Sequence, residues 1–452
     1  MSLLLIKNGK VIVGSDAQVQ SVDLLIKDQI IVEIKPNIDI TELEKGSYLG
    51  LSKDEKITVI DASDKLVSPG FIQTHLHFCQ TLFRGSADDL ELLDWLRLRV
   101  WPMEAAHNPA SLAASAKLSV AELIKSGTTT ALTMETVHHT EVVLETVEKT
   151  GFRATIGKCM MDKGQGVPTR LSENTKDSLN ASLDLMKSWH SDSGRVNYCF
   201  APRFAISCTQ ELLETISKIA LENNLLIHTH ASENRREIEV VQSETGYRNV
   251  EYLQKVGLAG KNIALAHCIH VDEQEQQILA ETGTHVLHCP SSNLKLGSGI
   301  APVTEMLERG VSVSIGADGA PCNNNLDIFK EMRLAALLQK MRYGSTALPA
   351  KKAFYLATLA GAKALGLDKE IGSIEVGKRA DIIIIDLNQL HSTPAPDLLS
   401  TLVYSANSSD VETVIIDGQV LMNNRELKTM DEKEIIATAR NEYYQLINRA
   451  GI

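Results

Sequence analysis

The sequence predicts an α/β protein, a (β/α)8 barrel joined to a small β-sandwich that both chain ends build. Two observations lead to this fold class. Between residues 66 and 371, apolar strand-like segments alternate with amphipathic segments, as is typical of parallel βα units. On either side of that region the pattern changes to short strands separated by turns. We therefore expect sandwich halves over residues 1–65 and 372–452, the second including a terminal helix, and a catalytic barrel over residues 66–371.

The two flanks supply the strands of the expected sandwich. A charged stretch, Thr41–Glu55, is expected to be an exposed loop, and Lys433–Arg449 is expected to form the final helix. Neither flank is large enough to bury a core alone, so we expect the two to pack together. The expected strands are Leu3–Ile6, Lys10–Val13, Val22–Lys27, Ile30–Ile34 and Ile57–Asp61 before the barrel, and Ile382–Asp386 and Val411–Ile416 after it.

Eight apolar segments between residues 66 and 318 are candidates for the barrel strands. Segments at helical spacing lie between or after them, for example Leu112–Lys125, Glu211–Leu221 and Leu326–Met341. Eight such units close a (β/α)8 barrel, whose active site lies at the carboxyl ends of its strands. The expected strands are Leu66–His77, Thr128–Met134, Arg153–Met160, Val196–Pro202, Leu225–His230, Ile263–His267, His285–Cys289 and Val311–Asp318.

The amino-acid composition of the chain limits the classes of partner that it can be expected to bind. The chain has 452 residues, 44% apolar and 23% charged, with a formal net charge of −12. That acidity argues against a nucleic-acid partner and favours a neutral or cationic small molecule. No apolar run has the length of a membrane span, and the N-terminus lacks the pattern of a signal peptide. The seven cysteines are dispersed without a Cys-x-x-Cys motif, so we expect a cytoplasmic protein.

Metal-competent side chains occur at the ends of four expected strands. His75 and His77 are spaced i, i+2, so both imidazoles leave the same face of a strand. His230 and Asp318 end two further strands. A single histidine would not indicate a metal site, but several metal-competent residues at matched strand ends do. Three or more nitrogen and oxygen ligands with one open position are typical of catalytic zinc. We expect one Zn²⁺ on these four residues, although Fe²⁺ or another divalent ion suits the same ligands.

Two further residues have candidate roles in catalysis. Glu233 follows His230 by three positions and can serve as general acid and base, or be a charge at a helix N-terminus. His267 ends another expected strand and can polarise the attacked atom, relay a proton or add a ligand. Asp318 can combine metal binding with proton transfer. Together these residues predict hydrolysis by a water molecule that the metal activates.

The motifs resemble those of the amidohydrolase superfamily, specifically its cytosine-, guanine- and adenosine-type deaminases and triazine hydrolases. The matching segments are Pro69–His77, His230–Glu233, Leu265–Cys268, His288–Leu296 and Gly316–Asn325. The resemblance covers essentially the whole chain. It implies a mononuclear metal on His75, His77, His230 and Asp318, with Glu233 and His267 catalytic. Binuclear members carry a lysine at the end of the fourth strand, where this chain has Ala201-Pro202-Arg203.

Within that superfamily the sequence is most similar to deaminases of 5′-deoxyadenosine, methylthioadenosine and S-adenosylhomocysteine. Glu104 matches the residue that grips the ribose in those enzymes, and Arg170 resembles their loop arginine. Gln80, Lys158 and Arg203 instead resemble the purine contacts of guanine deaminase. Trp95 is a candidate wall for the base or a helix-core residue.

The resemblance therefore implies hydrolytic removal of the exocyclic amine of an adenosine-type nucleoside. Guanine deamination and triazine hydrolysis are the alternatives, and a non-enzymatic scaffold is a remote third. A homo-oligomer is expected on the same grounds. The 5′ substituent of the substrate is left open by these motifs.

Overall fold

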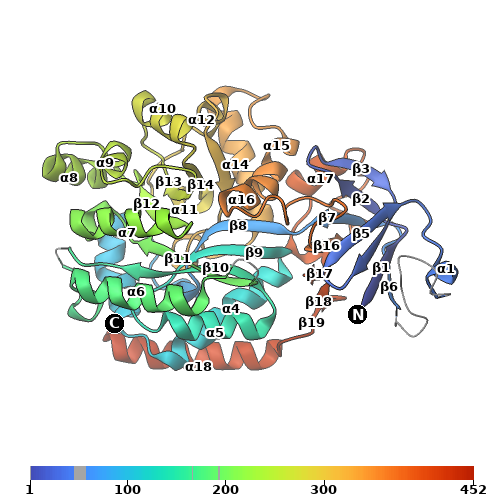
Figure 1. Cartoon of the computed structure of the whole chain (residues 1–452), viewed down its shortest axis with the longest axis horizontal. Helices are drawn as coiled ribbons and strands as arrows, with labels where there is room; N and C mark the ends of the chain where they lie inside the picture. The colour runs from blue at the N-terminus through green and yellow to red at the C-terminus, as the bar shows by residue number, and fades with distance from the viewer. Residues whose placement is uncertain (1, 45–56, 165, 192–193) are drawn as a thin grey trace.

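The computed structural model describes residues 2–44, 57–164, 166–191 and 194–452. Its central sheet has eight parallel strands in the order β15-β14-β13-β12-β11-β10-β9-β8. Helices lie between consecutive strands and cover the outside of the sheet (Figure 1). The predicted (β/α)8 barrel is confirmed. Its strands are β8 (Phe71–Leu76), β9 (Thr128–Met134), β10 (Arg153–Met160), β11 (Val196–Pro202), β12 (Ile227–Ala231), β13 (Ile263–His267), β14 (His285–His288) and β15 (Ser312–Ile315).

The barrel closes between its first and last strands. Leu76 and Asp318 form a parallel bridge, and the Asp318 amide donates to the His75 carbonyl at 2.9 Å. Gly316 allows this approach, because a Cβ there would lie 2.6 Å from the His75 nitrogen. Closure thus brings the end of β15 against the end of β8, where two candidate metal ligands lie.

The helices of the barrel begin and end with ordinary capping signals. In α4 (Pro109–Lys125), Asn108 and Ser111 form a reciprocal capping box and Pro109 occupies the first turn. The other long helices of the barrel are α5 (Thr140–Thr150), α6 (Thr175–Trp189), α7 (Gln210–Glu222), α8 (Arg235–Thr245), α10 (Glu273–Thr282) and α14 (Ile328–Tyr343). None of the helices in the described ranges is both long and apolar enough to cross a bilayer.

One expected strand, Leu66–His77, is divided in two. Its first part, β7 (Leu66–Pro69), pairs with β16 (Ile382–Ile385) in the sandwich, and its second part, β8, begins the barrel. The chain passes between the sheets at Gly70, where a Cβ would lie 2.1 Å from Thr129 Oγ1. The Pro69-Gly70 pair at this point is a turn signal that the expected single strand overlooked, and close packing against Thr129 leaves no room for a side chain at residue 70.

The smaller domain is a sandwich of two sheets beside the barrel (Figure 1). Side chains from both chain ends, including Leu24, Ile26, Ile382 and Ile415, share one apolar core. The predicted pairing of the two ends is therefore confirmed, while the exact boundaries at residues 65 and 372 stay predictions. The first sheet contains β5 (Ile30–Lys35), β4 (Asp23–Lys27), β1 (Leu3–Lys7) and β6 (Ile57–Asp61); the second contains β19 (Glu426–Leu427), β18 (Gln419–Asn423), β17 (Val411–Ile416), β16, β7, β2 (Lys10–Val13) and β3 (Gln18–Ser21).

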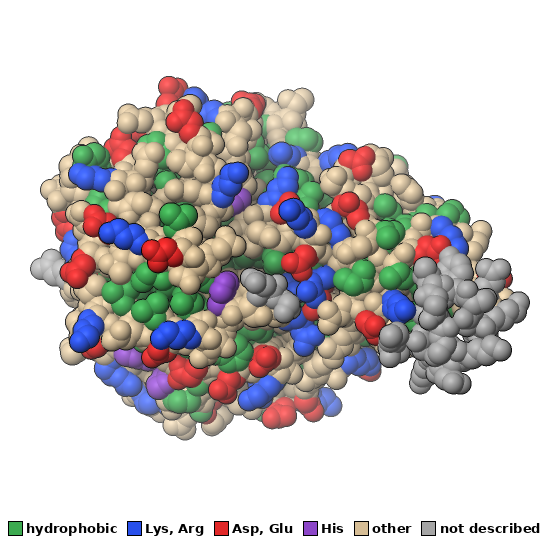
Figure 2. Space-filling view, viewed as in Figure 1, with side chains coloured by type: hydrophobic (Ala, Val, Ile, Leu, Met, Phe, Trp, Pro, Cys, Tyr) green, Lys and Arg blue, Asp and Glu red, His purple; other side chains and the backbone are tan. Residues whose placement is uncertain are grey.

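Two terminal features complete the fold. The start of the expected loop Thr41–Glu55 belongs to a short helix, α1 (Ile40–Glu44), and residues 45–56 lie outside the described ranges. Helix α18 (Glu432–Ala450) runs along the barrel and packs on α4, with Leu446 buried against Phe83 and Met103 (Figure 1). On the face shown in Figure 2, Lys and Arg side chains are interspersed with Asp and Glu side chains.

A buried ion-pair cluster joins the barrel to the sandwich and predicts a large effect on stability. Arg153 on β10 contacts Asp381 at 2.9 Å and Asp417 at 2.5 Å, with all three side chains at most 5% exposed. Arg153→Met leaves Asp381 buried without a cation, so we expect a loss of about 3–5 kcal/mol of unfolding free energy. Arg309→Met, which removes an exposed pair with Glu273, is the control and should cost less than about 1 kcal/mol. Equal denaturation midpoints for the two variants would contradict this account.

Candidate active site

Four side chains converge where the barrel strands end. His75 and His77 leave β8 on the same side because two positions separate them along an extended strand. His77 Nε2 lies 3.2 Å from Asp318 Oδ1 and 3.4 Å from His230 Nε2. His75 Nε2 lies 3.2 Å from the same carboxylate oxygen. One ligand atom from each of these four residues lies within 4.8 Å of all the others.

The orientation of the imidazoles is fixed at their second nitrogen. His77 Nδ1 donates to the Met134 carbonyl and His230 Nδ1 donates to the Arg203 carbonyl, each at 2.7 Å. These contacts keep the protons on Nδ1 and leave the Nε2 lone pairs free to bind a metal ion. The histidines therefore present the tautomer that a metal ligand requires.

Burial determines the charge of these groups. Burial lowers the pKa of His75 to about 4 and the pKa of His230 well below its usual value, so both imidazoles are neutral near pH 7. Burial alone would raise the pKa of Asp318, but the adjacent imidazoles of His75 and His77 outweigh it and hold that pKa well below its usual range. Asp318 has the opposite effect on His77: burial lowers the pKa of that imidazole, but the adjacent carboxylate outweighs burial and raises it. Imidazoles beside one carboxylate match the preferences of a divalent transition metal.

The site also leaves a buried nitrogen without a partner. His75 Nε2 has no hydrogen bond within the described residues, although its distance from Asp318 Oδ1 is short. An unsatisfied buried acceptor of this kind is costly unless another group binds it. The residues present therefore fit a divalent cation, and the site has the composition of a metal centre.

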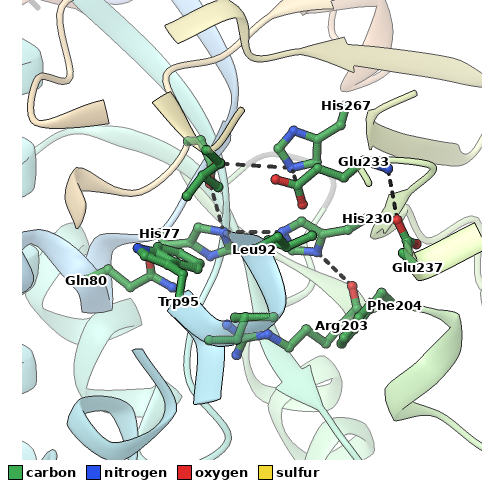
Figure 3. A pocket seen from close by; sticks show the side chains of 13 residues that line it. His77, Gln80, Leu92, Trp95, Arg203, Phe204, His230, Glu233, Glu237 and His267 are labelled. Carbon is green, nitrogen blue, oxygen red and sulfur yellow. Dashed lines mark hydrogen bonds and ion pairs between the residues drawn. The ribbon is translucent and has the colours of Figure 1, made fainter. Parts of the chain in front are cut away.

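Glu233 and His267 lie next to each other, close to His230 (Figure 3). Glu233 is 4% exposed, its Oε2 lies 3.5 Å from His267 Nε2, and its Oε1 has no hydrogen-bond partner in the described part of the chain. Burial raises the pKa of this carboxyl well above its usual range, and Asp318 raises it further. The side chain is thus able to carry a proton near neutral pH and to release it within the cavity.

The backbone is strained at two of these residues. His267 has φ of 73° and Asp318 has φ of 63°, both in the left-handed region that side chains other than glycine rarely adopt. His267 is held there with its Nδ1 2.8 Å from Asn293 Oδ1, and Asp318 accepts from Ser292 Oγ at 2.6 Å. Such strain concentrates at functional sites, where the surrounding structure imposes it.

A small cavity lies over the centre. Its volume is about 30 Å³. Figure 3 shows Gln80 and Trp95 on one side of it and Glu233 and His267 on the other. The lining residues are His77, Gln80, Leu92, Trp95, Leu96, Arg203, Phe204, His230, Glu233, Glu237, His267, Leu296 and Asp318.

The other expected substrate contacts lie outside the cavity lining. Glu104 is 3% exposed and lies one layer behind it, where it accepts from Gln80 Nε2 at 2.8 Å and from Arg203 Nη1 at 2.7 Å. Lys158 forms a buried ion pair with Glu173 at 2.6 Å and lines a separate pocket. Arg170 is exposed. The structure thus brings Gln80, Trp95 and Arg203 to the cavity and keeps the other three away from its surface.

Comparison with known proteins assigns the family. A model of the amidohydrolase family matches residues 66–421. The chain belongs to the amidohydrolase family. It is 42% identical over 382 residues to a protein of Moorella thermoacetica named 5-methylthioadenosine/S-adenosylhomocysteine deaminase, covering 84% of this chain and 87% of the relative. It is also 42% identical over 391 residues to the 5′-deoxyadenosine deaminase of Methanothermobacter thermautotrophicus, with 86% and 89% covered.

Solved structures agree with this assignment. An adenosine deaminase from Xanthomonas campestris with bound zinc has a TM-score of 0.90 and 31% identity to this amidohydrolase, over 98% of each chain. A guanine deaminase from C. acetobutylicum with bound guanine has a TM-score of 0.82 and 28% identity, over 93% of this chain and all of the other. Triazine hydrolases at 22% identity share the fold.

Several site residues of this amidohydrolase were not anticipated from the sequence. Glu237 accepts from the Glu233 amide at 2.9 Å and lines the cavity. It is the last residue of an Asn-x-x-Glu capping box that begins at Asn234, a signal that the sequence does contain. Asn293 and Ser292, which contact His267 and Asp318, lie within a motif that carried the family resemblance but had no assigned role.

Proposed function

We propose that this amidohydrolase is a zinc-dependent deaminase that hydrolyses the exocyclic C–N bond of an adenosine-type nucleoside. The observation that carries the proposal is Glu233, a buried carboxyl with an unpaired oxygen beside four convergent candidate metal ligands. The names of the relatives, deaminases of 5′-deoxyadenosine, methylthioadenosine and S-adenosylhomocysteine, support the substrate class.

His75, His77, His230 and Asp318 would hold the ion. When bound, a divalent cation at this position supplies a Lewis acid that makes water nucleophilic near neutral pH. Zinc suits three imidazole nitrogens and one carboxylate oxygen, and the X. campestris structure contains zinc. Among these four residues, the carboxylate of Asp318 is the one that contributes a negative charge.

Proton transfer falls to Glu233. Its carboxyl protonates the ring nitrogen next to the amine-bearing carbon, which makes that carbon electrophilic, and takes up the proton that the attacking water loses. The second proton of the water then passes to the amine, the C–N bond breaks to release ammonia, and the oxygen stays on the ring carbon as a carbonyl. His267 Nδ1 donates to Asn293 Oδ1, so Nε2 presents a lone pair toward Glu233 and Asp318, where it can accept a proton and pass it on.

The base would lie between Trp95 and the cavity floor, with polar contacts from Gln80 and Arg203. Gln80 Oε1 and Trp95 Nε1 are buried and have no hydrogen-bond partner in the described ranges. An acceptor and a donor are thus free for the edge of a purine. Leu92, Leu96 and Phe204 supply the apolar surface that a stacked ring requires.

A second candidate, deamination of a bare base such as guanine, is favoured by one observation. Glu104 is buried behind the cavity lining, where its carboxylate accepts from Gln80 and Arg203 and does not face the space that a ribose would occupy. A bare base has no ribose, so it requires Glu104 only to position Gln80 and Arg203.

Glu104→Gln separates the two candidates. If Glu104 binds the ribose, the substitution lowers kcat/KM for 5′-deoxyadenosine at least 10-fold more than for adenine, because a hydrogen bond to a charged group contributes about 1.5–3 kcal/mol. Steady-state kinetics with both compounds measure the ratio. Glu91→Gln, an exposed change near the cavity wall, should leave the ratio unchanged. An unchanged ratio in Glu104→Gln would limit Glu104 to positioning Gln80 and Arg203.

Ammonia release by the metal-analysed protein tests the proposed function itself. The panel contains 5′-deoxyadenosine, methylthioadenosine, S-adenosylhomocysteine, adenosine, guanine and a chlorotriazine. Turnover of the nucleosides supports the proposal, and turnover of guanine alone would replace it with the second candidate. The seven free, buried cysteines support a reducing, cytoplasmic location, and a homo-oligomer stays a prediction for light scattering to test.

A further inference from the structure

The three candidate imidazole ligands are held in two different ways. His77 and His230 donate from Nδ1 to backbone carbonyls, which no substitution removes. The Nδ1 of His75 instead lies 2.6 Å from Nε2 of His228, a side chain. The support of His75 is therefore the one of the three that depends on a residue type.

His228 lies on the same strand as a candidate ligand. In β12, His228 and His230 are separated by two positions, so both project toward the interior of the barrel end. The His228-Thr229-His230 segment thus has the same His-x-His spacing as His75-Leu76-His77. His228 of this segment contacts His75 of the other. The His75 and His228 rings are perpendicular, at 88°, with centroids 4.8 Å apart. His228 is fully buried, and its nitrogen is outside the group of four convergent ligand atoms.

The contact fixes the position of a proton. His75 Nε2 faces Asp318 and has to offer a lone pair to a metal ion, so the His75 proton resides on Nδ1. That proton is donated to His228 Nε2, and His228 then carries its own proton on Nδ1. An acceptor at this place orients the ring and excludes the other tautomer, in which Nε2 is blocked by hydrogen.

We propose that His228 is a positioning residue that fixes the tautomer and orientation of His75 and thereby sets how tightly the metal ion is held. The inference rests on the proposed metal site and goes beyond it, because it assigns the strength of that site to a residue that does not bind the ion. Its chemistry is specific: the position requires a hydrogen-bond acceptor aimed at His75 Nδ1.

Zinc affinity, measured by competition with a chromogenic chelator, tests the assignment on the full-length protein. His228→Leu removes the acceptor and should weaken zinc binding by about 10–100-fold, the usual effect of losing such a partner. His228→Gln keeps an acceptor oxygen at similar reach and should recover most of the affinity. His288→Leu is the matched control, since His288 is buried on β14 with neither ring nitrogen hydrogen-bonded in the described part of the chain.

The outcomes separate this inference from the proposed function. Affinity of His228→Leu within twofold of wild type, or an equal loss in His288→Leu, would overturn the role of His228. If His228→Leu does not fold, His228→Asn, whose amide is too short to reach, should show the same loss. Wild-type protein that binds one zinc but deaminates nothing would refute the proposed function and leave the inference standing, while failure to bind zinc would refute both.

Discussion

Glu233→Gln should keep its metal ion and lose about 10³-fold in kcat. The amide has the shape of the carboxyl but cannot take up or release the proton that general acid–base catalysis transfers. Burial and Asp318 raise the pKa of Glu233 well above its usual range, so the surroundings favour the neutral form of this side chain and suit a neutral amide in its place. Stability should therefore change little. Single-turnover rates test the loss of activity, and metal content per chain tests the retention of the ion.

The control for this variant is Glu239→Gln on the exposed face of α8. It makes the same chemical change in the next turn of the chain and should leave kcat within twofold of wild type. Full activity in Glu233→Gln would exclude Glu233 as the proton carrier. Loss of both metal and activity would instead indicate that Glu233 contributes to binding the ion.

His230→Ala should lose both the metal and the activity. Its Nε2 lies 3.4 Å from that of His77, and removal leaves three of the four convergent groups and an opening in the cavity floor. We expect less than about one tenth of the wild-type metal content and a fall of at least about 10³-fold in turnover, in line with the role of the ion in activating water. Elemental analysis of the dialysed protein measures the first.

His190→Ala provides the comparison, because His190 is a partly exposed histidine outside the barrel end that contacts Asn197. It should retain metal and activity. Normal metal content in His230→Ala would remove that residue from the ligand set and leave His267, the nearest remaining imidazole, as the candidate replacement.

The barrel was predictable because its buried parallel strands correspond to short, mainly apolar segments of the sequence that are followed by polar residues. Segments such as Thr128–Met134 and Ile263–His267 agree with the structure at both ends. The division of Leu66–His77 at Gly70 was missed although Pro69-Gly70 is a turn signal, because the apolar residues on both sides favour one continuous strand. The helix at Ile40–Glu44 was missed because its charged sequence is equally typical of a loop.

The site likewise has residues that the sequence predicted and contacts that it did not. The convergence of His75, His77, His230 and Asp318 follows from period-2 geometry and from the rule that strand ends meet at one face of a barrel. The contacts among Gln80, Glu104 and Arg203 join residues up to 99 positions apart, and no local pattern encodes them. Likewise the sequence marks His228 as part of a strand, while its contact with His75 requires the closed barrel.

The most direct test of the account is deamination in water enriched in ¹⁸O. Zinc-loaded protein is incubated with 5′-deoxyadenosine, methylthioadenosine or S-adenosylhomocysteine, and product mass and ammonia are measured together. We expect one ammonia released for each product molecule, and one ¹⁸O on the ring carbon that carried the amine. Absence of ammonia from all three nucleosides, or a product without ¹⁸O, would contradict hydrolytic deamination of an adenosine-type substrate.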